Sequence, residues 1–214
     1  LKLENVEVTI QAAPILRGVT LELGAGERVG LIGRNGAGKT TVMRAITGLA
    51  PLAGGKVSYD GQDISRMAPE ARARLGFGYM PEDRRLVPQL TVEENMLLPA
   101  WANPEIDGTK GLAFVYDLMP ELARMSSRKA MLLSGGQQKM VALGRALIAG
   151  RRLLLLDEPF EGVAPALAQR ISEVIISLRQ EGLSLLLAQS ELSHSEELLE
   201  RECRIERGEI VAEG

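Results

Sequence analysis

The sequence predicts an α/β fold with a mostly parallel sheet, an antiparallel β flank and an inserted helical subdomain. Short apolar runs bounded by turn residues alternate with longer segments of helical periodicity, an order typical of helices layered on a parallel sheet. Strand-like runs disappear between residues 85 and 148, where apolar residues recur at helical spacing. We therefore expect a sheet-based core made of residues 1–84 and 149–214, interrupted by a helical subdomain of residues 85–148.

Before residue 85, the expected elements are strands at 2–10, 19–23, 27–32 and 56–59 and a helix at 39–49. The first two strands alternate apolar and polar residues, as antiparallel strands with one exposed face do. The third is an apolar run that ends at a glycine, which predicts a buried strand. Gly54 and Gly55 predict a turn before the last of these strands.

After residue 85, the expected elements are helices at 92–98, 111–119, 137–148 and 165–180, and strands at 153–156, 183–188, 203–206 and 210–212. Four consecutive leucines at 153–156 predict a strand that is buried on both faces. The last segment, 196–213, is rich in charge, so we expect most of it to be solvated surface. Within it, Cys203 is expected to be a small buried residue.

Composition indicates one compact domain and excludes some functions. Hydrophobic residues make up 45% and charged residues 25% of the 214 residues, values that suit a sizeable core. The net charge of −3 argues against a protein that grips nucleic-acid phosphates, which usually needs a basic face. A single cysteine excludes an internal disulfide and favours a reducing compartment.

No segment of the sequence predicts a membrane span. The first residues, Leu1–Asn5, do not form a charged region followed by an apolar run, so no signal peptide is expected. Apolar runs such as Leu183–Ala188 fall far short of the roughly 20 residues that a spanning helix needs. We expect a soluble protein that reaches a membrane only through a partner.

One glycine-rich segment, Gly33–Thr40, matches the phosphate-loop pattern G-x-x-x-x-G-K-[ST] at every fixed position, between an expected strand and an expected helix. Its glycines let consecutive N–H groups point at phosphate oxygens, and the helix N-terminus adds a partial positive charge. Lys39 is expected to face solvent and to bind the β- and γ-phosphates, and Thr40 to ligate Mg²⁺. The motif predicts a P-loop NTPase core; the alternative is a strand-to-helix turn without a ligand. The expected nucleotide-binding residues are Gly33, Arg34, Asn35, Gly36, Ala37, Gly38, Lys39, Thr40 and Thr41.

Two acids follow the run of four leucines. Asp157 and Glu158 therefore emerge at the carboxyl end of a buried strand, where ligands bind in open α/β sheets. Asp157 can hold Mg²⁺ through its water shell, because Mg²⁺ takes few carboxylate ligands. Glu158 can accept a proton from an attacking water molecule. The alternative is a strand that simply ends in two solvated acids.

A third motif, Leu-Ser-Gly-Gly-Gln at residues 133–137, starts a helical pattern. A serine hydroxyl, two glycines and a helix N-terminus can bind an anion, although an ordinary serine-capped helix looks the same. Phosphate loop, signature motif and paired acids occur in that order, with a helical segment between the first two. This combination resembles the ABC ATPase family over essentially the whole chain, and the resemblance implies an ATPase that uses ATP and Mg²⁺.

The resemblance also implies a mechanism that one chain does not complete. In this family two ATPase subunits, identical or different, enclose two ATP molecules head to tail. The residues that would contact the partner's ATP are Ser134, Gly135, Gly136 and Gln137. Further implied partners are two transmembrane permease subunits and, indirectly, a periplasmic binding protein, whereas no nucleic acid is expected. The implied location is peripheral, on the cytoplasmic face of the inner membrane.

Three departures from the commonest family pattern narrow the resemblance. Glu82 stands where a glutamine usually touches Mg²⁺ and the water, Ala164 replaces an aspartate, and Gln189 replaces the switch histidine. His194 lies five residues too late to substitute and is expected on a surface helix. These features resemble the second ATPase subunit of branched-chain amino-acid importers, whose relatives carry urea or short amides. The expected catalytic residues are Glu158, Gln189 and Glu82, and the expected metal ligands are Thr40, Asp157 and Glu82.

Two positions concern aromatic side chains. The aromatic residue that stacks on adenine in this family aligns with Ile10, and no Tyr, Phe or Trp lies nearby. We therefore expect Ile10 to contact the base and nucleotide binding to depend mainly on the triphosphate and Mg²⁺. Trp101 lies in the helical region, where we expect it to pack in the interior; a contact with a membrane subunit is the alternative.

Two other functions are compatible with parts of the sequence. Soluble ABC ATPases that act on ribosomes or DNA usually carry two ATPase modules or a long coiled coil, and neither feature is present. A regulatory subunit that binds nucleotide without hydrolysis is favoured only by Glu82 and Gln189, and the intact Glu158 argues against it. The sequence determines neither the transported substrate nor the partner ATPase.

Overall fold

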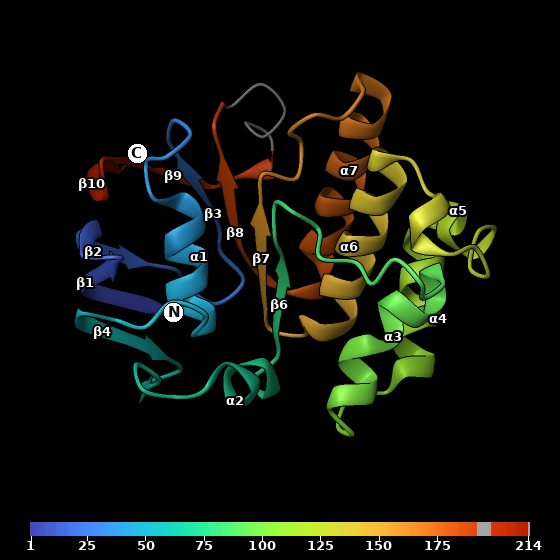
Figure 1. Ribbon diagram of the computed structural model, residues 1–214, viewed down its shortest axis with the longest axis horizontal. Coiled ribbons are helices and arrows are strands. Elements are labelled where there is room, and N and C mark those ends of the chain that lie inside the picture. The colour runs from blue at the N-terminus through green and yellow to red at the C-terminus, as the bar shows by residue number, and fades with distance from the viewer. Residues whose placement is uncertain (192–197, 214) are drawn as a thin grey trace.

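The computed structural model describes residues 1–191 and 198–213, and it is built around a six-stranded sheet in the order β10-β9-β3-β8-β7-β6 (Figure 1). Its strands are β3 (Arg28–Ile32), β6 (Phe77–Met80), β7 (Leu153–Asp157), β8 (Ser184–Gln189), β9 (Arg201–Glu206) and β10 (Glu209–Glu213). All neighbouring pairs are parallel except β9 and β10. The expected mostly parallel sheet is confirmed.

The expected antiparallel flank is also present, as a second sheet in the order β2-β1-β4-β5. Its strands are β1 (Lys2–Ile10), β2 (Ala13–Glu22), β4 (Gly54–Tyr59) and β5 (Gln62–Asp63). β2 begins six residues earlier than expected, because Gln11 and Ala12 both have positive φ and close a tight hairpin directly after β1. The expectation of a turn at Gly54 and Gly55 is wrong, since both lie inside β4. A Cβ atom on Gly55 would lie 2.1 Å from the carbonyl oxygen of Asn5, so glycine permits the close approach of β1 and β4.

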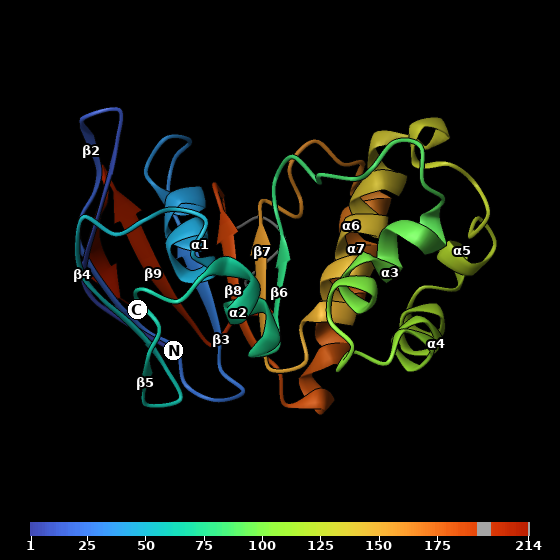
Figure 2. The same cartoon turned by 60° about the horizontal axis from the view of Figure 1, so that its bottom comes forward.

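Helices cover both faces of the six-stranded sheet (Figure 2). α1 (Lys39–Thr47) lies between the two sheets, whereas α6 (Gly135–Ala149) and α7 (Pro165–Ser177) lie on the opposite face. Outside α6 lie α3 (Val92–Ala102), α4 (Gly108–Leu118) and α5 (Pro120–Ala123). The described residues also form α2 (Pro69–Arg74) and the short 3₁₀ helices η1 (Ala130–Leu132) and η2 (Leu178–Glu181).

The hydrophobic core consists of two clusters that meet at the six-stranded sheet. Leu153 and Leu155 of β7 pack in the cluster that contains α1 and the flanking sheet, whereas Leu154 and Leu156 pack in the cluster that contains α6 and α7. All four are at most 1% exposed, as expected for a strand covered on both faces. Cys203 is completely buried, which confirms its expected place in the core.

Residues 85–148 form helices, turns and one isolated β-bridge, between Thr91 and Lys129. α6 at the end of this segment shares its hydrophobic cluster with β7 and β8. The division of the chain into a core and a helical subdomain at residues 84 and 148 stays a prediction. None of the helices in the described ranges combines the length and the apolar composition that a membrane span requires.

Candidate nucleotide site

The glycine-rich segment forms the loop between β3 and α1. Gly36 and Gly38 have φ of 80° and 114°, values that favour glycine. A Cβ atom on Gly33 would lie 2.3 Å from the carbonyl oxygen of Ile205, so the loop passes against β9 without room for a side chain. Thr40 and Thr41 lie in the first turn of α1, whose N-terminus carries the partial positive charge that favours an anion.

Lys39 does not face solvent, so that expectation is wrong. Its side chain is 5% exposed, and its ammonium donates to the carbonyl oxygens of Gly33 and Arg34 at 2.5 and 3.3 Å. It also forms an ion pair with Glu158 at 3.0 Å, between Nζ and Oε1. A buried ammonium needs such partners because a low-dielectric interior penalises an unpaired charge. The phosphate-loop lysine and the expected base are therefore paired with each other in the buried site.

Glu158 follows β7 in an uncommon backbone conformation. Its φ is 51°, in the left-handed region that non-glycine residues rarely occupy, and its amide donates to the carbonyl oxygen of Ala188 at 2.9 Å. The side chain is 3% exposed. Strained backbone of this kind often accompanies functional residues, and here it turns the side chain toward Lys39 instead of continuing the strand.

Asp157, the last residue of β7, has a buried carboxylate with one free oxygen. Tyr79 donates to Oδ2 at 3.4 Å, whereas Oδ1 has no hydrogen-bond partner among the described residues. Burial, reinforced by the negative charges of Glu82 and Glu158 and opposed by the hydroxyl of Thr40, raises the pKa of Asp157 to about 6. An unsatisfied carboxylate oxygen beside a threonine hydroxyl fits Mg²⁺, which takes hard oxygen ligands and one or two carboxylates.

Two of the three residues that depart from the family pattern, Glu82 and Gln189, lie at the same corner. The carboxylate of Glu82 is exposed, and the pKa of Glu82 is raised by desolvation and then by the negative charges of Glu161 and Glu158. Gln189 ends β8, where its carbonyl accepts from Gly33 at 3.1 Å, and its side-chain Oε1 is buried without a partner among the described residues. Their catalytic and metal-binding roles stay predictions.

Ser190 is a polar residue at this corner to which the sequence assigned no role. Its hydroxyl lies 2.6 Å from Glu158 Oε1, 2.7 Å from Asn35 Oδ1 and 3.2 Å from Lys39 Nζ. The signal that could have identified it is its position directly after Gln189, at the carboxyl end of a strand beside the phosphate loop. His194, in contrast, lies outside the described residues.

The signature motif lies at the exposed N-terminus of α6, and no hydrogen bond or ion pair joins it to the phosphate loop within the described part of the chain. Ser134 accepts from the amide of Gln137 at 3.3 Å, and Gln137 accepts from the amide of Ser134 at 3.0 Å, which forms a capping box. Ser134 and Gly135 are exposed. A Cβ atom on Gly136 would lie 2.4 Å from a methyl group of Leu167, so the motif also packs closely against α7.

Lys139, one turn further along α6, connects the signature helix to the paired acids. Its ammonium is buried and donates to the carbonyl oxygen of Glu158 at 2.7 Å and to that of Glu161. Burial lowers the pKa of Lys139. A side chain from the signature helix therefore holds the backbone that carries Glu158. None of the sequence motifs predicts this contact.

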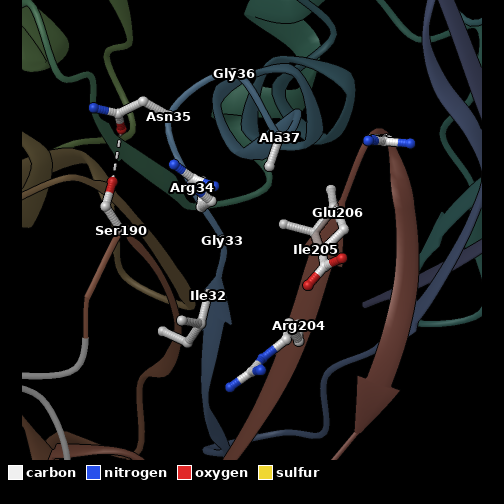
Figure 3. A pocket seen from close by; sticks show the side chains of 11 residues that line it. Ile32, Gly33, Arg34, Asn35, Gly36, Ala37, Ser190, Arg204, Ile205 and Glu206 are labelled. Carbon is white, nitrogen blue, oxygen red and sulfur yellow. Dashed lines mark hydrogen bonds between the residues drawn. The ribbon is translucent and has the colours of Figure 1, made fainter.

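A cavity of about 680 Å³ lies between the phosphate loop and the end of β9 (Figure 3). It is lined by residues 32–37, Ser190 and residues 204–207, and a cavity of this volume is within the range of small-molecule sites. Ile10 is 43% exposed in the β1–β2 hairpin and does not line this cavity. Its contact with a nucleobase stays a prediction. The expectation that Trp101 packs in the interior is wrong, since it is 58% exposed at the end of α3.

Comparisons with known proteins agree with this geometry. Residues 16–161 match the family model described as ABC transporter. The chain is 37% identical over 196 residues to the high-affinity branched-chain amino acid transport ATP-binding protein BraG of Pseudomonas aeruginosa, covering 92% of this chain and 84% of that protein. It is 32% identical over 213 residues to the lipopolysaccharide export system ATP-binding protein LptB of Escherichia coli, covering 99% and 88%.

Solved structures of ATP-binding cassettes share the fold. A nucleotide-free cassette from an ABC transporter superposes with a TM-score of 0.86 at 27% identity, covering 100% of this chain and 90% of that one. A dimeric bacterial ABC transporter cassette superposes with a TM-score of 0.88 at 25% identity, covering 100% and 97%. The family model covers more than half of the chain. This protein therefore belongs to the ABC transporter family, as an ATP-hydrolysing subunit that uses ATP and Mg²⁺.

Proposed function

We propose that this chain powers a bacterial importer of branched-chain amino acids, or of related small amino acids and amides, as the second of two ATPase subunits. The similarity to BraG, a branched-chain amino acid transport protein, carries the proposal. Glu82, Ala164 and Gln189 support it, because they match the pattern that the sequence shares with this type of subunit.

In the proposed mechanism, Lys39 exchanges its contact with Glu158 for the β- and γ-phosphates of ATP. The freed carboxylate of Glu158 then accepts a proton from water as the water oxygen bonds to the γ-phosphorus. The bond to the β–γ bridging oxygen breaks, and ADP and phosphate result. Mg²⁺, when bound, would be held by Thr40 and Asp157 with help from Glu82 and would neutralise the phosphate charge. Gln189 would orient the water or the γ-phosphate.

The exposed signature motif supports a shared site between two ATPase subunits. Ser134 and the N-terminus of α6 are accessible in the single chain and are suited to bind an anion that another molecule presents. In our proposal, that anion is the γ-phosphate of ATP bound to the phosphate loop of the partner. ATP then holds two subunits together until hydrolysis releases them.

The proposed complex includes two transmembrane permease subunits and, indirectly, a periplasmic binding protein. It places this chain peripherally on the cytoplasmic face of the inner membrane. Large apolar side chains near the signature motif and at the end of α3 are exposed and suit a protein contact: Val87, Trp101, Met131 and Leu132.

A second candidate is a subunit of an exporter of the LptB type. The similarity to LptB extends over 213 residues, a longer stretch than the match to BraG, at a slightly lower identity. Both candidates use the same ATPase chemistry and differ in the membrane subunits that this chain would bind.

Reconstitution distinguishes the two candidates. The chain is purified with the permease subunits of the same transporter and placed in proteoliposomes with their binding protein and ATP. We expect ATP-dependent accumulation of labelled leucine, isoleucine or valine, and none with the Glu158→Gln variant. ATP-dependent extraction of lipopolysaccharide without amino-acid uptake would favour the exporter, and urea or acetamide uptake would favour the amide branch.

A further inference from the structure

Ser190 contacts three polar side chains that meet beside the phosphate loop. Its hydroxyl lies within 3.2 Å of Glu158, Asn35 and Lys39, and its amide N–H donates to Glu158 Oε2 at 3.2 Å. One residue therefore contacts both carboxylate oxygens of the proposed base and two side chains of the phosphate loop. Figure 3 shows the contact between Ser190 and Asn35 across the edge of the cavity.

The hydroxyl of Ser190 has one hydrogen, so it donates to only one acceptor at a time. A hydrogen bond to a carboxylate is shorter and stronger than one to a neutral amide oxygen. The 2.6 Å contact with Glu158 is accordingly the one that carries the hydrogen. The lone pairs of the same oxygen then face the ammonium of Lys39, 3.2 Å away.

ATP binding changes this balance. When Lys39 turns to the phosphates, Glu158 loses its cation, and the remaining donors to its carboxylate among the described residues are the hydroxyl and the amide of Ser190. Both donors come from one residue at the end of β8, so they fix both oxygens of the carboxylate. A base held in this way keeps its direction toward the attacking water.

We propose that Ser190 is a positioning residue for ATP hydrolysis. It holds the carboxylate of Glu158 while Lys39 binds phosphate. The inference rests on the proposed role of Glu158 as the general base.

Ser190→Ala tests the hydroxyl alone, because it leaves the backbone amide in place. We expect kcat to fall about 10- to 100-fold, since a displacement of about 1 Å can cost 10²-fold in rate. The KM and the Kd for ATP should change less than about threefold. Ser190→Thr keeps a hydroxyl and should recover most of the lost rate. Ser58→Ala, which removes another half-buried hydroxyl from β4, should leave kcat and KM unchanged.

A double-mutant cycle separates positioning of Glu158 from any other effect. In single-turnover assays, Ser190→Ala should slow the parent strongly but slow Glu158→Gln less than about twofold, because residues that act through one group are not additive. Equal slowing in both backgrounds, or an unchanged kcat in Ser190→Ala, would overturn the inference. Near-parental turnover of Glu158→Gln would refute the base itself and the inference with it.

Discussion

The phosphate-loop corner and the signature end of α6 are two regions that we propose bind anions, and they are built in opposite ways. At the first, Lys39 and Glu158 are nearly inaccessible and paired with each other. At the second, Ser134 is exposed, and its capping box satisfies only the groups of its own helix. One region is assembled within a single chain before any ligand arrives, whereas the other offers a helix N-terminus to something outside the chain.

The two regions should therefore respond differently when a ligand binds. In our proposal, a ligand at the first region breaks the ion pair between Lys39 and Glu158, so its binding is coupled to the state of the proposed base. A ligand at the second only adds contacts to a preformed cap. Substitutions in the first region should therefore change stability and chemistry through one ion pair, whereas a substitution in the second should change stability through its helix cap and activity through the bound anion.

The largest expected effect tests the chemistry of the first region. Glu158→Gln should hydrolyse ATP roughly 10² to 10⁴ times more slowly, the usual contribution of a positioned general base, with ATP affinity close to that of the parent. Phosphate release and ATP binding are measured on the same preparations. Glu173→Gln, on α7 and outside the site, serves as control. Turnover near the parental rate would mean that a different carboxylate, with Glu82 the first to test, is the base.

The next effect tests whether the ion pair between Lys39 and Glu158 stabilises the fold. Lys39→Ala should abolish ATP binding and also lower the free energy of unfolding by about 3–5 kcal/mol, because it leaves a buried carboxylate without its cation. Adding Glu158→Gln to Lys39→Ala should restore most of that stability. Denaturant unfolding measures both changes. Lys110→Ala, which removes an exposed lysine, should leave stability unchanged; no recovery in the double variant would contradict the coupling.

A smaller effect follows from the raised pKa of Asp157. The folded chain binds this proton more tightly than the unfolded chain, whose aspartates titrate near 4, so this group lowers stability as pH rises from about 4 to 6. A shift of about two pKa units corresponds to at most about 3 kcal/mol. Asp157→Asn should therefore match the parent near pH 4 and be more stable at pH 7, in urea unfolding. Asp117→Asn is the control, and an equal difference at both pH values would argue against the shift.

The smallest effect compares two helix caps of the same design. Thr91 of α3 and Ser134 of α6 each form a capping box. Replacing either by alanine should cost about 1 kcal/mol of stability. Only Ser134→Ala should also weaken the rise of specific ATPase activity with protein concentration, because in our proposal that cap meets a second subunit. If Thr91→Ala alters this concentration dependence equally, the signature motif has no special part in the shared site.

Much of the fold could be predicted because its signals are local. The alternation of β1, the four leucines of β7 and the capping serine of α6 each depend on a few neighbouring residues, and each element formed where expected. β5, α2 and α5 were missed, since each spans at most six residues and depends on contacts from elsewhere in the chain. Gly55 was misread as a turn, because the need for glycine comes from a neighbouring strand.

The site divides in the same way. The phosphate loop and the paired acids follow from spacing, whereas the burial of Lys39 and the contacts of Ser190 and Lys139 depend on strands and helices that only the fold brings together. A lysine in a phosphate loop looks solvent-facing until the strand end that carries Glu158 is placed over it. The residue most easily overlooked, Ser190, is a small polar residue with no motif of its own.

The alternation of β7 between two cores gives separate experimental access to the two regions. Leu154 and Leu155 are adjacent in sequence and nearly identical in burial, yet one supports the α6 side and the other the α1 side. Truncating either to alanine removes about the same buried volume and should cost a similar 2–5 kcal/mol. Both variants would therefore lose a similar free energy of unfolding, but their cavities would lie on opposite faces of the six-stranded sheet. Such a pair separates the rigidity that the phosphate loop needs from the rigidity that the signature helix needs, because it places a cavity of three carbon atoms on one side of the strand or on the other.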